Sequence, residues 1–386
     1  MITNRQQPRG GIVQLTLTTF RSYDQVRLDC DVCPIVLTGA NGAGKTNILE
    51  AISWLSPGKG LRRASLGEVA NCKIPNRPWG VAAVLQKHTA AIDLATGLDP
   101  QSLLQGIERR VVQIDQKPVR GQAGLAEQVN ILWLTPQMDR LFLEGASERR
   151  RFVDRLVYSL DPLHSKRIQS YEHALRERSR LLRDGHFDPD WLSILEQRMA
   201  QEGVAVAVAR RDFLSELSKS FNTKDSIFPT PCVSMQGGVD EWLEQAAAVD
   251  VEHRLAQELK MRRVKDAERG GTSVGPHRSD FEVIMVASGQ KAAACSTGEQ
   301  KALLIAIILS AARLTITQGQ SVPILLLDEV VAHLDALRRK ALLNELTELQ
   351  VQCWLTGTDR ERFQFLQDKA QFFQVENSTI IPQSML

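Results

Sequence analysis

Hydrophobic and polar positions change their spacing twice along the chain, and each change predicts a different kind of structure. In the first third, short apolar segments are separated by turns with glycine and proline, which predicts β-strands. From residue 122 to about residue 269 the spacing is helical, apart from a looser stretch at residues 221–238. The last third returns to mixed elements. The predicted strands lie at residues 12–18, 26–28, 35–38, 81–86, 111–114, 281–286, 323–327 and 353–356, with a helix at residues 299–314.

The order of these elements predicts an α/β protein interrupted by a helical lobe. A chain of 386 residues exceeds the length at which one hydrophobic core keeps growing, so two compact parts are expected. We expect residues 1–121 and 271–386 to form a sheet-based head with a β-rich subdomain, and residues 122–270 to form the inserted lobe. Apolar positions recur every seven residues from Ile168 to Leu182. The insert is too short for a long coiled-coil arm, so this stripe is expected to pack within a compact lobe.

Composition describes an ordinary globular protein and names no partner. The chain has 43% hydrophobic and 24% charged residues, and its net charge of +2 is too small to indicate nucleic-acid binding. The first residues lack the apolar stretch of a secretory signal, and the longest apolar run, residues 302–314, is too short to span a bilayer. We therefore expect a cytoplasmic protein with no membrane segment. Of six cysteines, only Cys30 and Cys33 have a metal-like spacing, and we interpret all six as reduced thiols.

A glycine-rich segment joins the predicted strand at residues 35–38 to a segment with helical spacing at residues 47–55. Glycines in such a turn let backbone N–H groups surround phosphate oxygens, and the helix amino terminus adds about half a positive charge. Lys45 is expected to face the β and γ phosphates, and the Thr46 hydroxyl to face magnesium. The segment has the pattern of a P-loop. The predicted ATP-binding residues are Gly39, Ala40, Asn41, Gly42, Ala43, Gly44, Lys45, Thr46 and Asn47.

Two adjacent carboxylates, Asp328 and Glu329, follow the apolar strand at residues 323–327. Parallel sheets bind their ligands at the carboxyl ends of strands, and acids on an apolar strand are costly unless they are used. We predict that Asp328 holds magnesium, through water, and that Glu329 polarises the attacking water as general base. With Lys45, these residues predict ATP hydrolysis with Mg²⁺ as cofactor. The alternative is an acidic strand-to-loop edge without a catalytic role.

Ser296 and Glu299 have the S-x-x-E spacing of a capping box, which by itself predicts only the start of a helix. The string Ser296-Thr297-Gly298-Glu299-Gln300 also resembles the signature motif of ABC-type ATPases, and it lies 32 residues before Asp328. The resemblance implies that Ser296, Gly298, Glu299 and Gln300 meet the γ-phosphate bound to a second copy of the chain. A capped helix amino terminus also favours an anion. We therefore expect an ATP-dependent homodimer.

Other elements of that family follow in order. Gln137 resembles the Q-loop glutamine, which implies a place among the catalytic and magnesium-binding residues. The string Ala332-His333-Leu334-Asp335 resembles the D-loop. The switch histidine of many transporters is missing, because Thr356-Gly357-Thr358-Asp359 follows the last core strand. The sensor of the γ-phosphate is therefore not identified by the resemblance.

Within the ABC/SMC class, the length of the insert is most similar to that of the RecF family of bacterial recombination-repair ATPases. Four further strings resemble this family: residues 19–23, 60–64, 148–154 and 275–280. The resemblance implies repair at single-strand gaps, help in loading the strand-exchange protein, a role in the SOS response to DNA damage, and partners similar to RecR and RecO. It also implies a weak ATPase that DNA stimulates. The alternatives are the ATPase subunit of an ABC transporter and a solitary P-loop kinase.

DNA contacts are expected only where basic residues cluster. No aromatic residues alternate with these clusters, which favours phosphate contacts on duplex DNA, or on a single-strand/double-strand junction, over base stacking. A second stripe, Arg176, Arg180 and Arg183, is equally well explained as a solvated face. The predicted DNA-binding residues are Arg149, Arg151, Arg155, Arg262, Arg263 and Lys265.

The string Gly275-Pro276-His277-Arg278 allows two interpretations. It is either a turn that leads into the strand at residues 281–286 or, by the family resemblance, a part of the nucleotide or DNA face.

Overall fold

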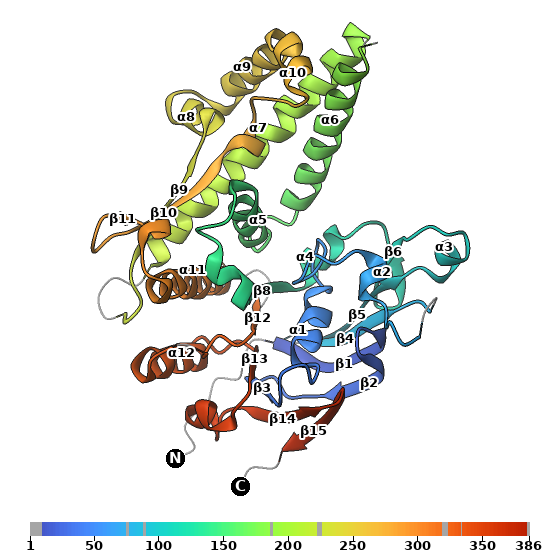
Figure 1. Ribbon diagram of the computed structural model, residues 1–386, viewed down its shortest axis with the longest axis vertical. Helices are drawn as coiled ribbons and strands as arrows, with labels where there is room; N and C mark the ends of the chain where they lie inside the picture. The colour runs from blue at the N-terminus through green and yellow to red at the C-terminus, as the bar shows by residue number, and fades with distance from the viewer. Residues whose placement is uncertain are drawn as a thin grey trace. The chain divides into compact units, whose positions relative to one another are not determined.

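The computed structural model describes residues 10–74, 77–87, 90–185, 188–221, 226–318, 323–332 and 334–383 (Figure 1). The chain divides into two compact units. Unit 1 comprises residues 1–138 and 311–386, and unit 2 comprises residues 139–310.

The first sheet of unit 1 is antiparallel and has the strand order β2-β1-β4-β5-β6-β7. Its strands alternate between core and surface. In β1, Leu15 and Leu17 are buried, whereas Thr16 and Thr18 are not. This sheet is the β-rich subdomain expected from the sequence. Its elements are β1 (Gly10–Phe20), β2 (Tyr23–Asp29), α2 (Leu66–Val69), β4 (Gly80–Lys87), β5 (Ala91–Leu98), α3 (Pro100–Leu104), β6 (Arg110–Ile114), β7 (Lys117–Val119) and α4 (Ala123–Gln128).

The second sheet of unit 1 has the order β15-β14-β3-β13-β12-β8, and all neighbours are parallel except β15 with β14. Strands β3, β12, β13 and the edge strand β8 are buried along their whole length, as expected for parallel strands that are covered on both faces. The elements are β3 (Ile35–Thr38), α1 (Lys45–Ser53), β8 (Asn130–Leu134), η1 (Pro136–Arg140), β12 (Pro323–Leu327), α12 (Ala336–Glu348), β13 (Cys353–Gly357), η4 (Arg360–Leu366), β14 (Gln371–Glu376) and β15 (Thr379–Gln383).

Unit 2 is a helical lobe that carries a small antiparallel sheet of order β11-β10-β9. Helices α6 and α7 run side by side as a hairpin (Figure 1). Gly185 ends α6 in a left-handed conformation, and the Asp188 carboxylate caps α7. The elements are α5 (Ala146–Val157), α6 (His164–Asp184), α7 (Pro189–Ser220), β9 (Pro231–Gln236), α8 (Gly238–Gln245), α9 (Ala248–Met261), α10 (Arg263–Arg269), η2 (Pro276–Arg278), β10 (Asp280–Met285), β11 (Gln290–Lys291) and η3 (Ala292–Ala294).

The boundaries of the lobe differ from the expected residues 122–270. The segment up to Leu134 belongs to unit 1, because β8 pairs with β12 in the parallel sheet. The strand predicted at residues 281–286 belongs to unit 2, because β10 pairs with β9. Periodicity predicted the strand but not its pairing partner, since that partner is distant in sequence.

Helix α11 (Thr297–Thr317) begins in unit 2 and ends in unit 1. Within the described residues it is the one helix that is long and apolar enough to cross a membrane. However, 83% of its most apolar window is buried inside the protein. It therefore behaves as a core helix.

A buried arginine holds three helices of unit 2 together. The side chain of Arg178, in α6, is fully buried and donates to Glu196 at 3.0 Å, Asp266 at 2.9 Å and Thr272 at 2.8 Å. A second guanidinium, that of Arg210, forms two bonds to the Asp154 carboxylate, at 2.7 and 2.8 Å. Removing one partner of such a pair leaves a buried charge without compensation.

The string at residues 275–278 forms the turn η2 directly before β10. The Nε2 atom of His277 lies 3.0 Å from the carbonyl of Thr272, and Nδ1 lies 2.6 Å from the Tyr171 hydroxyl. A carbonyl only accepts, so Nε2 carries the proton and Nδ1 accepts from Tyr171. The bond that Nδ1 accepts from Tyr171 requires a neutral imidazole, whereas the bond to Thr272 would persist in the charged form. Burial accordingly lowers the pKa of His277 to about 4.

This histidine makes the stability of the protein depend on pH. In the unfolded chain His277 gains a proton below its ordinary pKa of 6.5, whereas in the folded protein it stays neutral down to about 4. The contribution of His277 is therefore complete above pH 6.5 and is lost as the pH falls towards 4. We expect His277→Gln to lessen the pH dependence of the unfolding free energy by up to about 1.4 kcal/mol per pH unit in this window.

The measurement is urea unfolding at a series of pH values between 7 and 4.5. His253→Gln is the matched control, because His253 is exposed on α9. Equal pH dependence of the wild type and His277→Gln would contradict the assignment of a buried neutral imidazole.

Candidate functional site

The glycine-rich segment forms a tight turn from β3 into α1. Gly39 has φ 146°, and a Cβ atom there would lie 2.2 Å from the backbone oxygen of Val375. Gly42 and Gly44 also have positive φ, and Gly44 precedes α1 without a side-chain cap. The turn therefore requires glycine at residue 39 both for its conformation and for its close approach to β14.

The side chain of Lys45 lies inside this turn. It is buried, and its ammonium group donates to the backbone oxygens of Gly39 at 2.6 Å and Ala40 at 2.8 Å. Burial lowers the pKa of Lys45, and the carboxylates of Glu329 and Asp328 oppose this shift. The predicted cation is thus held in the centre of the loop, within the electrostatic reach of both predicted acids.

Thr46 and Asp328 meet across the sheet. The Thr46 hydroxyl lies 3.0 and 3.2 Å from the two oxygens of the Asp328 carboxylate. Strands β3 and β12 are both parallel neighbours of β13, so their carboxyl ends reach the same edge of the sheet. Burial raises the pKa of Asp328, while hydrogen bonds from Thr356 and Thr46 act in the opposite direction.

Glu329 follows in a left-handed conformation with φ 49°, which is uncommon for a residue with a side chain. It is half-buried, and its backbone N–H donates to the Thr356 hydroxyl at 2.8 Å. Strand β13 supplies this hydroxyl from between the two strands that carry the predicted site residues. The structure thus brings Lys45, Thr46, Asp328 and Glu329 together at one edge of the sheet.

Gln137 of the predicted Q-loop and Asp335 of the predicted D-loop are exposed. Gln137 lies in η1, three residues after Leu134, whose backbone oxygen accepts from the N–H of Asp328 at 2.9 Å. Asp335 is the amino-terminal cap of α12 and accepts from the N–H of Arg338 at 2.8 Å. His333 lies outside the described residues. Gln137 therefore follows β8, the strand that pairs with β12. The carboxylate of Asp335 caps the start of α12.

The signature segment forms the predicted capping box at the start of α11. The N–H of Ser296 donates to Glu299 at 2.8 Å, and the N–H of Glu299 lies 3.3 Å from the Ser296 hydroxyl. Gln300 is buried and donates to the backbone oxygen of Cys295 at 2.9 Å. Ser296 is exposed, and Gly298 is half-buried in the first turn. The segment presents a helix amino terminus, which favours negative charge.

Most of the predicted DNA-binding arginines have partners within unit 2. Arg149 makes two bonds of 2.7 Å to the Asp280 carboxylate, and Arg263 donates to Glu196 at 2.6 Å. Arg262 pairs with Glu258 at 2.7 Å, and Arg155 lies over the ring of Phe152 at 5.4 Å. Of the predicted set, Arg151 and Lys265 are the exposed side chains, and Arg151 also contacts Glu148. The sequence indicated the clusters but not these internal partners.

The sequence patterns did not indicate one buried carboxylate, that of Glu50 in the helix after the glycine-rich turn. Glu50, in α1, is fully buried and accepts from Arg21 at 2.6 and 3.0 Å and from Arg62 at 2.8 Å. Asn47 accepts from the same Arg62 at 2.8 Å. Two features of the sequence could have indicated this cluster. The strings at residues 19–23 and 60–64 each contribute one of the arginines, and Glu50 is an acidic residue among the apolar positions of the helix. These contacts fix α1 against the first sheet.

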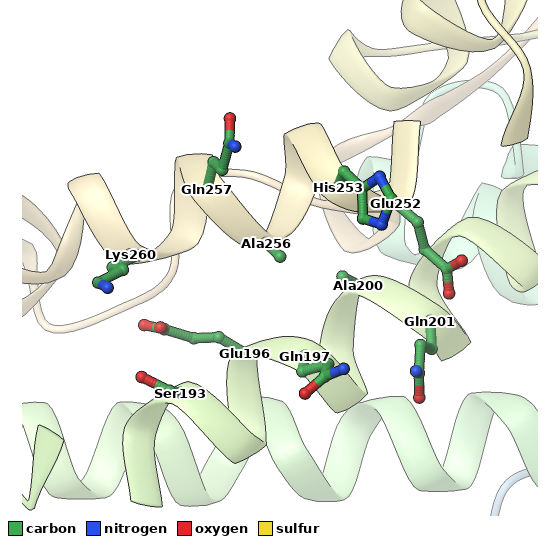
Figure 2. Close-up of a pocket in the computed structure, with 10 residues that line it drawn as sticks. All are labelled: Ser193, Glu196, Gln197, Ala200, Gln201, Glu252, His253, Ala256, Gln257 and Lys260. Atoms are coloured by element: carbon green, nitrogen blue, oxygen red, sulfur yellow. The ribbon is translucent and has the colours of Figure 1, made fainter. Parts of the chain in front are cut away.

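A separate pocket of about 330 Å³ lies between α7 and α9 in unit 2 (Figure 2). Most of its lining residues have polar side chains, but Glu196 already accepts from Arg178 and Arg263. Within the described part of the chain, no group of three or more His, Cys, Asp or Glu residues is arranged to hold a metal ion. The ten residues that line the pocket are Ser193, Glu196, Gln197, Ala200, Gln201, Glu252, His253, Ala256, Gln257 and Lys260, and the sequence predicted none of them as site residues.

The P-loop, the acidic strand end and the two sheets define an ATPase head of the ABC/SMC class. Residues 11–381 match the family described as the RecF/RecN/SMC N terminal domain. A DNA replication and repair protein RecF of Rhizobium rhizogenes is 43% identical over 371 residues, which are 96% of this chain and 98% of that relative. One of Agrobacterium fabrum is 41% identical over 382 residues, with 98% and 100% covered. This chain therefore belongs to the RecF family, and the resemblance drawn from the sequence motifs is confirmed.

A solved structure agrees in fold. The recombination mediator protein RecF-ATPrS in the RecFOR pathway superposes with a TM-score of 0.84 at 20% identity, covering 98% of this chain and 99% of that one. At this identity the likeness concerns the fold alone. The predicted α/β head of ABC/SMC type with an inserted helical lobe is confirmed.

The close contact at Gly39 predicts a position-specific cost for a single methyl group. We expect Gly39→Ala to lower the unfolding free energy by at least ~2 kcal/mol, because the added carbon meets the backbone of β14. Gly42→Ala is the matched control, because a Cβ at Gly42 meets nothing within 4 Å and costs only roughly 1 kcal/mol of backbone strain. Urea unfolding compares the two variants. Equal losses in both would show that the contact with Val375 carries no penalty.

Proposed function

We propose that the chain is an ATP-dependent, DNA-binding dimeric clamp that acts in recombinational repair at single-strand gaps. The observation that carries the proposal is the contact between Thr46 and Asp328, beside a buried Lys45 within a glycine turn. Two segments far apart in the sequence supply these groups to one edge of a parallel sheet, which is where such folds bind ligands. Membership of the RecF family supports the same conclusion.

The residues fit ATP and magnesium by their chemistry. At Gly39 there is no room for a side chain, because a Cβ atom would meet the backbone of β14. The backbone N–H groups of the loop, residues 39–47, suit phosphate oxygens. Lys45 supplies a positive charge for the β and γ phosphates. The hydroxyl of Thr46, the carboxylate of Asp328 and the amide of Gln137 are the hard oxygen ligands that Mg²⁺ prefers. When bound, the ion neutralises charge on the transferring phosphate.

In hydrolysis, the protein's own residues hold the phosphates and orient the attacking water. Lys45 offsets phosphate charge, Asp328 fixes the position of Thr46, and Glu329 accepts a hydrogen bond from the attacking water and polarises it. All of these groups lie at one edge of a largely buried sheet. Charges interact more strongly in such partly desolvated surroundings than they do in water.

Dimerisation completes the site in this proposal. The start of α11, with Ser296, Gly298, Glu299 and Gln300, is proposed to face the γ-phosphate held by a second copy of the chain. The amino terminus of this helix supports the role, because its partial positive charge favours an anion. Asp335 is proposed to lie at the same dimer contact. ATP then acts as a latch that closes the clamp, and hydrolysis opens it.

DNA is the proposed partner of the closed dimer. The relatives are named as DNA replication and repair proteins, which supports this assignment. The contacts are proposed to go to the phosphates of duplex DNA or of a junction with single strands. Arg151 and Lys265 are the most available of the predicted residues, whereas Arg149, Arg155, Arg262 and Arg263 would have to leave the contacts described above.

The wider pathway is also part of the proposal. We propose cytoplasmic action with partners similar to RecR and RecO, help in loading the strand-exchange protein, and a role in the SOS response. The fold-level likeness to a protein of the RecFOR pathway supports these partners. DNA is proposed to stimulate a weak ATPase, since the closed dimer completes both sites.

The first test is ATP turnover per protomer across a range of protein concentrations, with and without duplex DNA. Turnover is expected to rise with concentration and with DNA, because each site needs a second copy.

Glu329→Gln should lower turnover by roughly 100-fold while ATP still binds, and Lys45→Ala should weaken ATP binding itself. Ser296→Arg should abolish ATP-driven dimers and leave ATP binding to the monomer intact. Turnover that is independent of both concentration and DNA would instead indicate a solitary P-loop enzyme.

The second test concerns the DNA footprint. Lys265→Gln is expected to lower the salt dependence of duplex binding by about one unit of log–log slope, since one phosphate contact is lost. Lys219→Gln is the control, because Lys219 is an exposed lysine of α7 that pairs with Glu216 and lies outside the predicted clusters. A Lys265→Gln slope and affinity equal to those of the wild type would remove this lysine from the footprint.

A further inference from the structure

A threonine near the end of the core strand β13 has a role that neither the motifs nor the family comparison assigns. Many ABC-type ATPases carry a switch histidine after this strand, and this chain has none there. Thr356 lies within the strand, one residue before Gly357, and its side chain is fully buried. The inference below rests on the proposed ATPase function and names a residue that positions its acids.

The Thr356 hydroxyl joins the two predicted acidic residues. It lies 2.7 Å from Oδ1 of Asp328 and accepts the backbone N–H of Glu329 at 2.8 Å. A hydroxyl has one proton, and an ionised carboxylate can only accept, so that proton points to Asp328. The bonds therefore form a directed chain from the N–H of Glu329, through the hydroxyl, to the carboxylate. Hydrogen bonds to a charged acceptor are the stronger kind.

The orientation of the Asp328 carboxylate is set more by its bond to Thr356 than by its bond to Thr46 in the loop. The single proton of the Thr46 hydroxyl is shared between both carboxylate oxygens, at 3.0 and 3.2 Å. Thr356 instead makes a shorter contact with Oδ1 alone. It therefore fixes the rotation of the carboxylate, and with it the direction in which the remaining lone pairs point.

Glu329 depends on the same hydroxyl through its backbone. A residue with a side chain is strained at φ 49° and holds that conformation only where the surroundings enforce it. The bond from its N–H to Thr356 is such a constraint. Since the backbone direction at residue 329 sets where the side chain starts, Thr356 also determines where the carboxylate of Glu329 can reach.

The fold leaves Thr356 little freedom. Leu327 pairs with Leu355 in parallel register, so Asp328 and Thr356 lie one step beyond that pair on adjacent strands. Gly357 follows, and a Cβ atom there would lie 2.6 Å from the ring of Phe363. The end of β13 thus pairs with β12 and lies against Phe363 of η4, and the hydroxyl has a defined place.

We propose that Thr356 is a positioning residue for ATP hydrolysis, which orients Asp328 for the metal and holds the backbone of Glu329 for its contact with water. It touches neither nucleotide nor water in this proposal. Its effect should therefore appear in the catalytic rate and in the response to Mg²⁺, and not in the affinity for ATP alone.

The test compares Thr356→Val, which keeps the shape and removes the hydroxyl, with Thr356→Ser, which keeps the hydroxyl. We expect Thr356→Val to lower kcat by about tenfold or more and to raise the half-saturating Mg²⁺ concentration several-fold, because both acids lose their orientation. ATP binding without Mg²⁺ should change less than about twofold, since Lys45 and the loop are untouched. Thr356→Ser should restore most of the rate.

Thr315→Val is the matched control. Thr315 is also fully buried in unit 1, and its hydroxyl donates to Ala311 at 2.9 Å and accepts from Asn130 at 3.2 Å. Asn130 begins β8, at the end opposite to the candidate site. This variant removes an equivalent buried hydroxyl and should keep the wild-type kcat and Mg²⁺ response of the folded protein.

The outcomes separate this proposal from the proposed function. A wild type without ATP turnover above that of Lys45→Ala would contradict the ATPase itself. Wild-type turnover with unchanged kcat and Mg²⁺ response in Thr356→Val, or no rescue in Thr356→Ser, would overturn the role of Thr356. If Thr356→Val does not fold, Thr356→Cys replaces it, because a thiol is only a weak donor. A wild-type rate in that variant would overturn the role as well.

Discussion

The hydrogen bond between Thr46 and Asp328 is the contact on which the candidate site depends. It joins residues 282 positions apart in the chain. It can form only because β3, β13 and β12 run parallel in one register, so that three loops leave the sheet at the same edge. The whole of unit 2 is inserted between these strands, yet the register of buried apolar residues brings their ends together. The sheet is therefore the scaffold of the chemistry, and the insertion leaves its geometry intact.

The residues at this edge are held in conformations and surroundings that isolated peptides avoid. Gly39 has no space for a side chain, Lys45 is desolvated, and Glu329 has a left-handed backbone. Two of them are compensated locally: the Lys45 ammonium by two carbonyls, and Glu329 by the hydroxyl of Thr356. Strain and buried charge concentrated at one place are characteristic of sites that have been organised before their ligand arrives.

Unit 2 illustrates a different use of charge. Its most buried guanidinium groups, those of Arg178 and Arg210, are bound to carboxylates inside the lobe, and Arg149 holds the start of β10 through Asp280. A cluster of arginines in the sequence is thus not in itself a surface for nucleic acid. Buried ion pairs of this kind add little net stability, but breaking one is costly, so they define one arrangement of the helices.

The sequence by itself determined the elements whose signals are local: the P-loop between strand and helix, the acidic end of β12, the capping box at Ser296 and the helical character of the insert. Their chemistry lies within a few neighbouring residues, which periodicity and turn preferences report directly. Only the tertiary structure decided that β8 joins the parallel sheet, that β10 pairs with β9, that Arg149 is bound to Asp280 and that Thr356 joins both acids. These contacts link residues far apart in the chain, and they depend on strand register and burial, which no local pattern contains.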